Sequence, residues 1–294
     1  MKSFYKKSGF ILLTVSAAAA AALAVFNRGI KKLEDVSYGE SNAQKVDIYL
    51  PRSNKSKCTA VVIYIHGGAW SGGDKSGYDV DCLREVKNGY AAATINYRML
   101  DEGATWVDML EDITSAMETV KSTAADNGIS LSKAALTGAS AGAHLAMLYS
   151  YKNQDIAPIK IAFCGNLCGP SNLLDINVAE KSGDPVWVYA VLSGLIGEKL
   201  DITTFNDLSE TLKAASPVTY ITKDSPPTIV AHGQKDDVVL YSQGLDVYNA
   251  FTALGVACEL ISFPNSGHGL DNDPDAARRY KQLFSAYETK YFGY

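Results

Sequence analysis

The sequence predicts an α/β fold, in which helices cover both faces of a mostly parallel sheet. Strand-like segments alternate with helical segments of ten or more residues, which are long enough to connect parallel strands. The apolar, β-branched run at 60–65 is typical of a strand buried within such a sheet. In addition, several expected strands end in glycine-rich or polar motifs, and the carboxyl ends of strands are where such sheets carry functional residues.

One domain is expected over residues 29–294. The chain of 294 residues is 47% hydrophobic, which is enough for one sizeable core. No low-complexity linker or internal repeat divides it beyond the N-terminal segment. The formal net charge is −5 and no basic cluster follows the N-terminus, so composition argues against a nucleic-acid partner.

Residues 1–28 have a different composition. Lys2, Lys6 and Lys7 precede an apolar run at 10–26. A basic start followed by an apolar run with small residues is typical of an export signal. Because a full membrane span needs about 20 strongly apolar residues, we predict a cleaved signal and a secreted or periplasmic protein. The alternatives are an uncleaved anchor, which would associate the protein with a membrane, and a buried N-terminal helix.

The expected elements follow in order along the chain. Strands are expected at 45–51, 60–68, 90–98, 133–140, 159–169, 227–233 and 257–264. Helices are expected at 78–89, 106–128, 144–151, 242–255 and 274–292. The first two helices are amphipathic and stop at Gly89 and at an Asn-Gly pair. Residues 170–224 are expected to be irregular and cap-like, with an apolar patch at 186–197.

Four strand ends carry motifs that converge on one kind of chemistry. They are HGGAW after 60–65, GASAG after 134–137, HGQKD after 227–231 and PNSGHG after 257–263. In GASAG, Ser140 lies between Gly138 and Gly142, the G-x-S-x-G pattern of a tight strand-to-helix turn. The glycines avoid clashes between crossing backbones, and the following helix directs its N-terminal N–H groups at the site. Ser140 is therefore the candidate nucleophile.

A serine hydroxyl needs a neighbouring base, which here must be one of four histidines. His268 lies after the last strand between two glycines, and this position in the chain order indicates the base. His66 is expected to support the first glycine loop, His144 to pack beneath the serine turn, and His232 to form a structural hydrogen bond.

The base in turn needs a carboxylate that orients it, and this is expected on the loop after the strand at 227–231. Asp236 is the preferred candidate, and its neighbour Asp237 is the alternative on the same loop. Asp175 and Asp271 are weaker rivals.

Acyl transfer also needs hydrogen-bond donors for the developing oxyanion. The HGGAW motif offers approachable backbone amides at Gly67, Gly68 and Ala69, because glycine carries no obstructing side chain. The amide of Ala141, directly after the nucleophile, completes the expected oxyanion hole.

A substrate pocket is expected between this site and the cap-like segment. Trp70, Trp187 and Tyr189 are its candidate residues. Because the segment is too short for a large lipase lid, we expect esters of small or medium size.

The five cysteines are Cys58, Cys82, Cys164, Cys168 and Cys258. An odd number leaves at least one thiol free within a monomer. The preferred interpretation is small buried hydrophobic residues, and one disulfide is the alternative for an exported protein. No Cys or His cluster in the sequence completes a metal site, and no organic cofactor is indicated.

Together these motifs resemble the α/β-hydrolase fold, in particular the hormone-sensitive-lipase-like and the bacterial feruloyl-esterase-like (BD-FAE-type) carboxylesterases. HGGAW, GGDK, NYR, GASAGAH, HGQKD and SGHG carry the resemblance, which covers about residues 34–294. It implies an eight-stranded sheet and the roles given above for Ser140, Asp236 and His268. HGGxW also resembles the motif of arylformamidases. The chain departs from many relatives at Ala69, Ala143 and Asn172.

The sequence thus predicts a serine hydrolase that cleaves a small-molecule carboxylic ester through an acyl-enzyme. An arylformamidase or another amidase is the alternative within the hydrolases. A catalytically silent binding protein on the same fold is the alternative from another class, although such proteins usually lose a triad residue.

Overall fold

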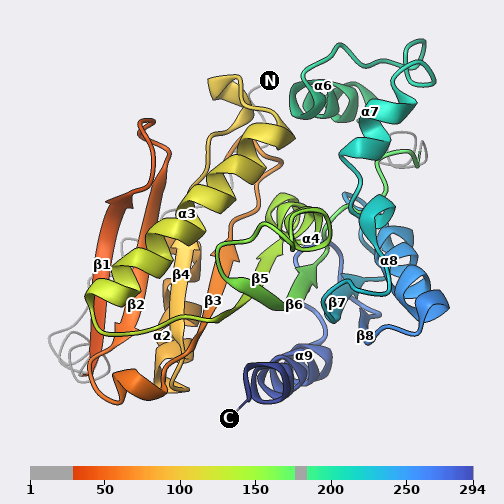
Figure 1. Ribbon diagram of the computed structural model, residues 1–294. Coiled ribbons are helices and arrows are strands. Elements are labelled where there is room, and N and C mark those ends of the chain that lie inside the picture. The colour runs from red at the N-terminus through yellow and green to blue at the C-terminus, as the bar shows by residue number, and fades with distance from the viewer. Residues whose placement is uncertain (1–28, 176–183, 294) are drawn as a thin grey trace, which may run out of the picture.

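The computed structural model describes residues 29–175 and 184–293. An eight-stranded sheet forms its centre, in the order β1-β2-β4-β3-β5-β6-β7-β8 (Figure 1). The strands are β1 (Ile30–Ser37), β2 (Lys45–Pro51), β3 (Ala60–Ile65), β4 (Ala91–Ile95), β5 (Lys133–Ala139), β6 (Lys160–Leu167), β7 (Thr228–Gly233) and β8 (Cys258–Phe263). Among the strand pairs of the described residues, only those that involve β2 are antiparallel. The predicted α/β class and the mostly parallel sheet are therefore confirmed.

Helices cover both faces of the sheet. They are α2 (Asp79–Lys87), α3 (Trp106–Asp126), α4 (Ala141–Lys152), α6 (Pro185–Ile196), α7 (Ser209–Ala214), α8 (Tyr241–Leu254) and α9 (Pro274–Tyr287). Buried residues of α3, α4 and α8 join one core, and those of α2 and α9 join the other. A π-helical turn, η5 (Glu288–Gly293), continues α9 to the end of the described chain.

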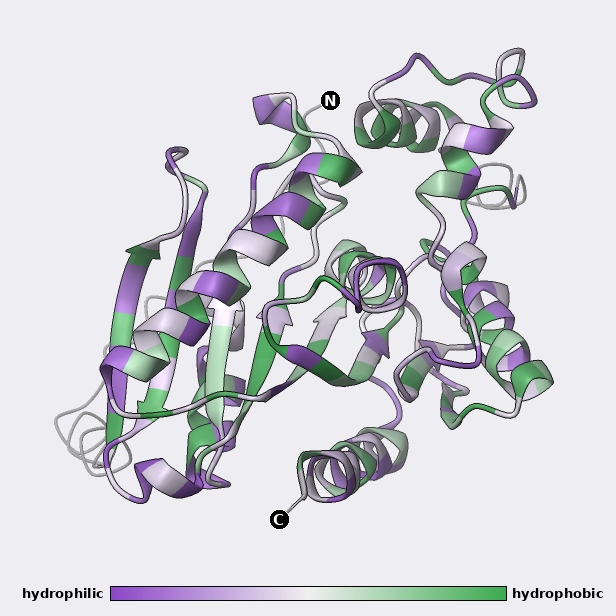
Figure 2. Ribbon diagram, viewed as in Figure 1, coloured by the Kyte–Doolittle hydropathy of each residue, from purple (hydrophilic) through white to green (hydrophobic). Residues whose placement is uncertain are grey.

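Strand β3 shows why a run of β-branched residues folds as a buried strand. Val61, Ile63 and Ile65 join one core, whereas Val62 and Tyr64 join the other. Successive side chains of a strand point to opposite faces, so an uninterrupted apolar run fills both cores at once. Figure 2 shows the hydrophobic residues concentrated in the central strands, while helix α3 carries bands of both colours.

Strand β1 was not among the expected elements. Its sequence, IKKLEDVS, is rich in charge, and Ile30 is its only buried residue. The strand lies at the edge of the sheet and pairs with β2 alone. Charged residues are common on edge strands, where they discourage pairing with other chains. The apolar signal used for the other strands is therefore weak here.

The expectation that residues 170–224 are irregular was wrong for α6 and α7. The side chain of Asp184 caps α6 by accepting a hydrogen bond of 3.0 Å from the amide of Trp187. Pro185 occupies the first turn, and Gly197 ends the helix in the left-handed conformation. These start and stop signals are visible in the sequence, whereas the uniformly apolar interior hides the helical periodicity.

Two of the predictions concern segments outside the described residues. The export signal or anchor falls on residues 1–28, and part of the cap-like segment falls on 176–183. Within the described parts of the chain, no helix combines the length and the apolar character that crossing a membrane requires.

Candidate active site

The four motif-bearing strands end at one edge of the sheet. Strands β3, β5, β6, β7 and β8 are neighbours in this order, and each pair is parallel. Their carboxyl ends therefore lie side by side, as in other open α/β sheets that bind ligands there.

Ser140 occupies a strained turn between β5 and α4. Its φ of 55° and ψ of −123° are unusual for a residue with a side chain, a strain that costs about 1–3 kcal/mol. A Cβ on Gly138 would lie 2.4 Å from the carbonyl oxygen of Ile65, and a Cβ on Gly142 only 2.0 Å from it. Both glycines are thus required because the turn crosses the end of β3 at close range.

Asp236 and His268 form a hydrogen-bonded pair at the same edge of the sheet. The Oδ2 atom of Asp236 accepts a hydrogen bond of 2.8 Å from Nδ1 of His268. Its Oδ1 atom accepts from the amides of Val238 and Val239, at 2.9 and 2.8 Å. Both carboxylate oxygens are engaged, so the orientation of the carboxylate toward the ring is fixed. The alternative acid, Asp237, is exposed.

The surroundings keep Asp236 ionised. Burial alone would raise the pKa of its carboxyl group, but hydrogen bonds from His232 and His268 and from the amide of Val239 hold that pKa well below its usual value. An ionised carboxylate accepts the Nδ1 proton of His268 and so leaves Nε2 of the ring as the basic nitrogen. The side chain of His268 is 26% exposed, so the ring is accessible.

Ser140 lines a narrow pocket of about 60 Å³. The pocket walls are formed by Ala69, Trp70, Ser140, Ala141, Pro170, Leu173, Trp187, Val188, Val191, Leu192, Val238 and Val239. Val238 and Val239 therefore line the same pocket as the serine and hold Asp236 through their amides. Of the three expected pocket residues, Trp70 and Trp187 are in this lining and Tyr189 is not. Within 29–175 and 184–293, the Ser140 hydroxyl donates no hydrogen bond to another side chain.

The HGGAW loop presents free amides beside the serine. Gly68, Ala69 and Trp70 all have positive φ values, of 117°, 52° and 55°. The amides of Gly68 and Ala69 donate to no other group in the described residues. Ala141 is the first residue of α4, so its N–H has no acceptor within the helix.

Gly67 keeps this loop close to the nucleophile turn. A Cβ at this position would lie 2.6 Å from the carbonyl oxygen of Ala139 and 3.2 Å from Cβ of Ser140. No larger residue fits at that approach, and Ala69 and Ala141 line the same pocket as Ser140.

Residues after β4 support the HGGAW loop, a role that the sequence analysis did not assign. The ring of Tyr97 stacks on His66, with centroids 4.5 Å apart, and its hydroxyl donates to the carbonyl of His66 at 3.0 Å. Asn96 accepts a hydrogen bond from the amide of Lys75 at 2.6 Å and donates to Asp74 at 2.9 Å. Residues of the NYR motif therefore contact both the HGGAW loop and the GGDK motif that follows it.

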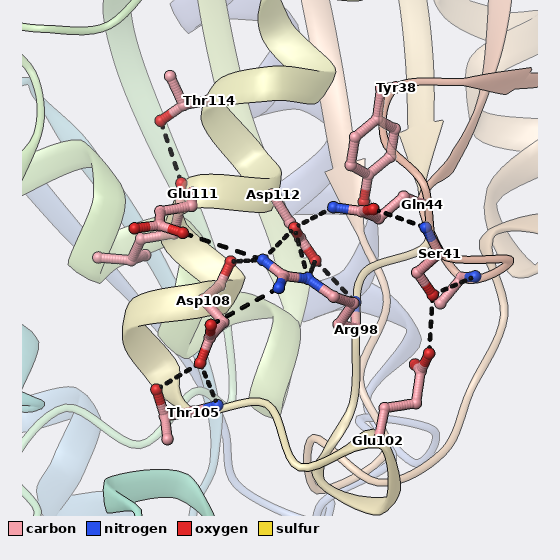
Figure 3. A network of polar contacts seen from close by, with 12 residues as sticks. Tyr38, Ser41, Gln44, Arg98, Glu102, Thr105, Asp108, Glu111, Asp112 and Thr114 are labelled. Atoms are coloured by element: carbon pink, nitrogen blue, oxygen red, sulfur yellow. Dashed lines mark hydrogen bonds and ion pairs between the residues drawn. The ribbon is translucent and has the colours of Figure 1, made fainter.

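Arg98 connects this support to helix α3. Figure 3 shows its guanidinium against the buried carboxylate of Asp112, which it binds at 2.8 Å from Nη2 and 3.0 Å from Nε. Asp112 also accepts from Gln44 at 2.7 Å, so the network reaches the loop between β1 and β2. A paired, hydrogen-bonded carboxylate of this kind stabilises the segment that follows β4.

The other histidines form structural contacts, as expected. Nδ1 of His66 lies 2.8 Å from the carbonyl of Gly67, and burial lowers the pKa of this ring. Nε2 of His144 donates to the carbonyl of Ala215 at 2.8 Å, and burial lowers its pKa to about 4. Nε2 of His232 donates to the carbonyl of Val239 at 2.8 Å and lies 3.5 Å from Asp236. His232 thus supports the loop that carries the acid.

Comparison with known families gives one match that covers most of the domain. The model of the BD-FAE family matches residues 46–251, which is more than half of the chain.

Curated relatives are similar at 24–35% identity. Esterase LipQ of Mycobacterium tuberculosis is 27% identical over 247 residues, which cover 81% of this chain and 57% of the relative. The kynurenine formamidase of Salmo salar is 26% identical over 247 residues, which cover 82% of this chain and 76% of the relative. The chain thus spans less than three fifths of the mycobacterial esterase.

Solved structures share the fold. A truncated carbohydrate esterase from gut microbiota superposes with a TM-score of 0.72 at 23% identity, over 88% of this chain and 96% of that one. Esterase B from Lactobacillus rhamnosis superposes with a TM-score of 0.71 at 20% identity, over 94% and 93% of the two chains. At this level of identity the likeness establishes the α/β-hydrolase fold.

Proposed function

The chain belongs to the BD-FAE family, and from that premise we propose that it is a serine hydrolase that cleaves carboxylic esters through an acyl-enzyme. The observation that carries this proposal is the pairing of an ionised Asp236 with His268, at the same sheet edge as a serine on a strained turn. A serine of this kind needs a base, and the base needs an orienting carboxylate, and the three residue types lie at one edge of the sheet.

In the proposed reaction, the Ser140 hydroxyl attacks the ester carbonyl while Nε2 of His268 takes its proton. Asp236 holds the imidazole in the correct tautomer and stabilises the positive charge that the ring acquires. The ring then gives the proton to the leaving alcohol, and the acyl group remains on Ser140. Water, deprotonated by the same ring, releases the acid and restores the serine.

The negative charge on the carbonyl oxygen would be stabilised by the amides of Gly68, Ala69 and Ala141. These amides have no competing acceptor in the described part of the chain, and fixed donors of this kind contribute most when charge develops. Removing one such donor typically lowers kcat by about 100-fold or more.

The pocket suits a short acyl group. It is narrow, at about 60 Å³, and side chains of α6 such as Val188 and Leu192 close its outer wall. Trp187, which is 47% exposed, stands at its opening. We therefore propose small-molecule esters with short acyl chains as substrates.

A series of p-nitrophenyl esters tests the proposal. Full-length protein should hydrolyse the acetate and butyrate esters with higher kcat/KM than the decanoate ester. Ser140→Ala should abolish turnover and labelling by a fluorophosphonate probe. Undiminished hydrolysis by Ser140→Ala would refute the nucleophile, and a preference for decanoate would refute the short pocket.

Hydrolysis of an aryl formamide is a second candidate. It is favoured by the kynurenine formamidase of Salmo salar, of which this chain covers 76%, a larger share than of LipQ. The same nucleophile and oxyanion donors would serve either bond. Measuring kcat/KM for N-formylkynurenine beside p-nitrophenyl acetate distinguishes the two, because a formamidase should favour the formamide.

The cellular location also remains a proposal. The basic and apolar composition of residues 1–28 supports export, with an uncleaved anchor as the alternative. N-terminal sequencing of the protein recovered from each cell fraction would separate cleavage from anchoring.

A further inference from the structure

Three side chains with different ligand atoms meet at the ends of neighbouring strands. Cys168 follows β6, Asp236 follows β7 and His268 follows β8. The Cys168 sulfur, an Asp236 carboxylate oxygen and a His268 ring nitrogen all lie within 4.8 Å of one another. From the sequence, Cys168 is expected to be a small buried hydrophobic residue, because its spacing from Cys164 completes no metal motif.

Sulfur, imidazole nitrogen and carboxylate oxygen are the ligand atoms that Zn²⁺ prefers. Zn²⁺ binds these atoms at about 2.0–2.3 Å in a tetrahedron, which places ligand atoms about 3–4 Å apart. The most separated of these atoms, at up to 4.8 Å, would need to approach by about 1 Å, whereas Asp236 Oδ2 and His268 Nδ1, now 2.8 Å apart, would need to move slightly apart. A fourth position would be left for water.

We propose that Cys168, Asp236 and His268 form an inhibitory binding site for a thiophilic divalent cation, for which Zn²⁺ is the probe. The cation would replace the proton of the Cys168 thiol, which would pass to solvent, and the proton on Nδ1 of His268 would move to Nε2, so that the ring binds as a neutral imidazole. His268 could then no longer donate from Nδ1 to Asp236, and Nε2, which would carry the proton, could no longer act as the base. That consequence for turnover rests on the proposed function, whereas the binding itself does not.

Burial decides which cations fit. Cys168 is 2% exposed and Asp236 is 6% exposed, so an ion would enter past the partly exposed ring of His268. A cation with a strong affinity for sulfur is needed to displace the proton of this buried thiol. Mg²⁺ prefers oxygen ligands and six-fold coordination, so it should not bind here.

Equilibrium dialysis of the full-length protein against ZnCl₂ measures binding without reference to activity. The wild type should bind one Zn²⁺ per chain, and Cys168→Ser and Cys168→Ala should each weaken binding by at least tenfold. Cys258→Ser is the matched control, because Cys258 is a free thiol at the opposite end of β8. In an assay with p-nitrophenyl acetate, Zn²⁺ should inhibit the wild type and the Cys258→Ser variant, each relative to its own metal-free rate, and Mg²⁺ should not.

Substitution with Co²⁺ supplies a measurement on the wild type that does not depend on any variant folding. A thiolate-to-cobalt charge-transfer band in the near ultraviolet is expected, and its absence would overturn the assignment. Zn²⁺ binding that is unchanged in both Cys168 variants, or lost in Cys258→Ser instead, would also overturn it. If Zn²⁺ binds as expected but no ester is hydrolysed, the metal site stands and the proposed function fails.

Discussion

Two buried carboxyl groups in this protein are held in opposite protonation states. Asp236 lies in the candidate site, and hydrogen bonds from two histidines and the Val239 amide outweigh burial and keep its pKa well below the usual value. Glu288 lies in η5, where burial and the nearby Glu85 carboxylate raise its pKa to about 9. Burial acts in the same direction on both groups, so the neighbouring donors and acceptors decide the difference.

The partners explain the contrast. Glu85 receives hydrogen bonds at 2.6 Å from both the Tyr64 hydroxyl and the Arg84 guanidinium. Glu288 stands against Glu85, and its Oε1 atom has no hydrogen-bond partner in the described chain. The Glu85–Glu288 pair therefore retains one proton, whereas the Asp236 carboxylate retains none. The protein uses an ionised carboxylate where it orients a base and a neutral carboxyl where it packs the C-terminal turn.

The largest effect is expected from Asp236→Asn. An amide can be oriented in the same place, but it cannot favour the Nδ1-protonated tautomer or stabilise the imidazolium. We expect kcat for a short-chain ester to fall by roughly 10³–10⁴-fold with little change in KM. Steady-state kinetics at neutral pH measures this.

The neighbouring residue supplies the control for that variant. Asp237→Asn removes the same charge from an exposed position on the same loop, and its kcat should stay within a few-fold of the wild type. A loss below tenfold in Asp236→Asn, or equal losses in both variants, would contradict the role proposed for Asp236.

The pH dependence of stability should differ in sign between the two carboxyl groups. The pKa of Glu288 is raised from 4.5 to about 9, so between these values the folded protein holds a proton that the unfolded chain releases. This contribution to stability is complete below pH 4.5 and is lost as the pH rises toward 9, by up to about 1.4 kcal/mol per pH unit. Asp236 has a lowered pKa, so its contribution is present above its usual pKa and is lost on acidification.

Glu288→Gln tests whether the folded protein holds a proton on this side chain. The variant keeps the shape of the protonated side chain and cannot ionise, so its free energy of unfolding should fall less between pH 6 and pH 8 than that of the wild type. Urea unfolding at the two values measures the difference, with Glu259→Gln at an exposed site as the control. The same pH dependence in Glu288→Gln and the wild type would show that Glu288 carries no proton.

Short sequence motifs predict those elements whose conformation depends on residues that are neighbours in the chain. The strand-to-helix turn at Ser140 follows from glycines two residues on either side, and the structure supplies the reason in the approach to Ile65. The apolar run of β3 predicted a strand buried on both faces, which is confirmed. The roles of Ser140, Asp236 and His268 in catalysis stay predictions, although Asp236 and His268 are in hydrogen-bond contact.

Features that depend on contacts between distant segments could not be predicted. The charged edge strand β1 gives a weak apolar signal, and the apolar interior of α6 hides its periodicity. The approach of Cys168 to the Asp236–His268 pair, and that of Glu85 to Glu288, arises where separate strands and helices pack. No spacing along the chain encodes such a meeting, because each partner is an ordinary residue in its own segment.

Tyr64→Phe is expected to have the smallest effect, confined to the Glu85–Glu288 pair. The substitution keeps the ring that stacks on Tyr78 and removes only the hydroxyl that donates to Glu85. Loss of a hydrogen bond to a charged group should lower the free energy of unfolding by about 1.5–3 kcal/mol, while kcat for a short-chain ester stays within a few-fold of the wild type. Urea unfolding and steady-state kinetics on the same preparation measure both, with Tyr248→Phe on α8 as the control. If kcat falls by more than the loss of folded protein explains, the Glu85–Glu288 pair influences the candidate active site. The two carboxyl sites would then be coupled and could not be treated as independent.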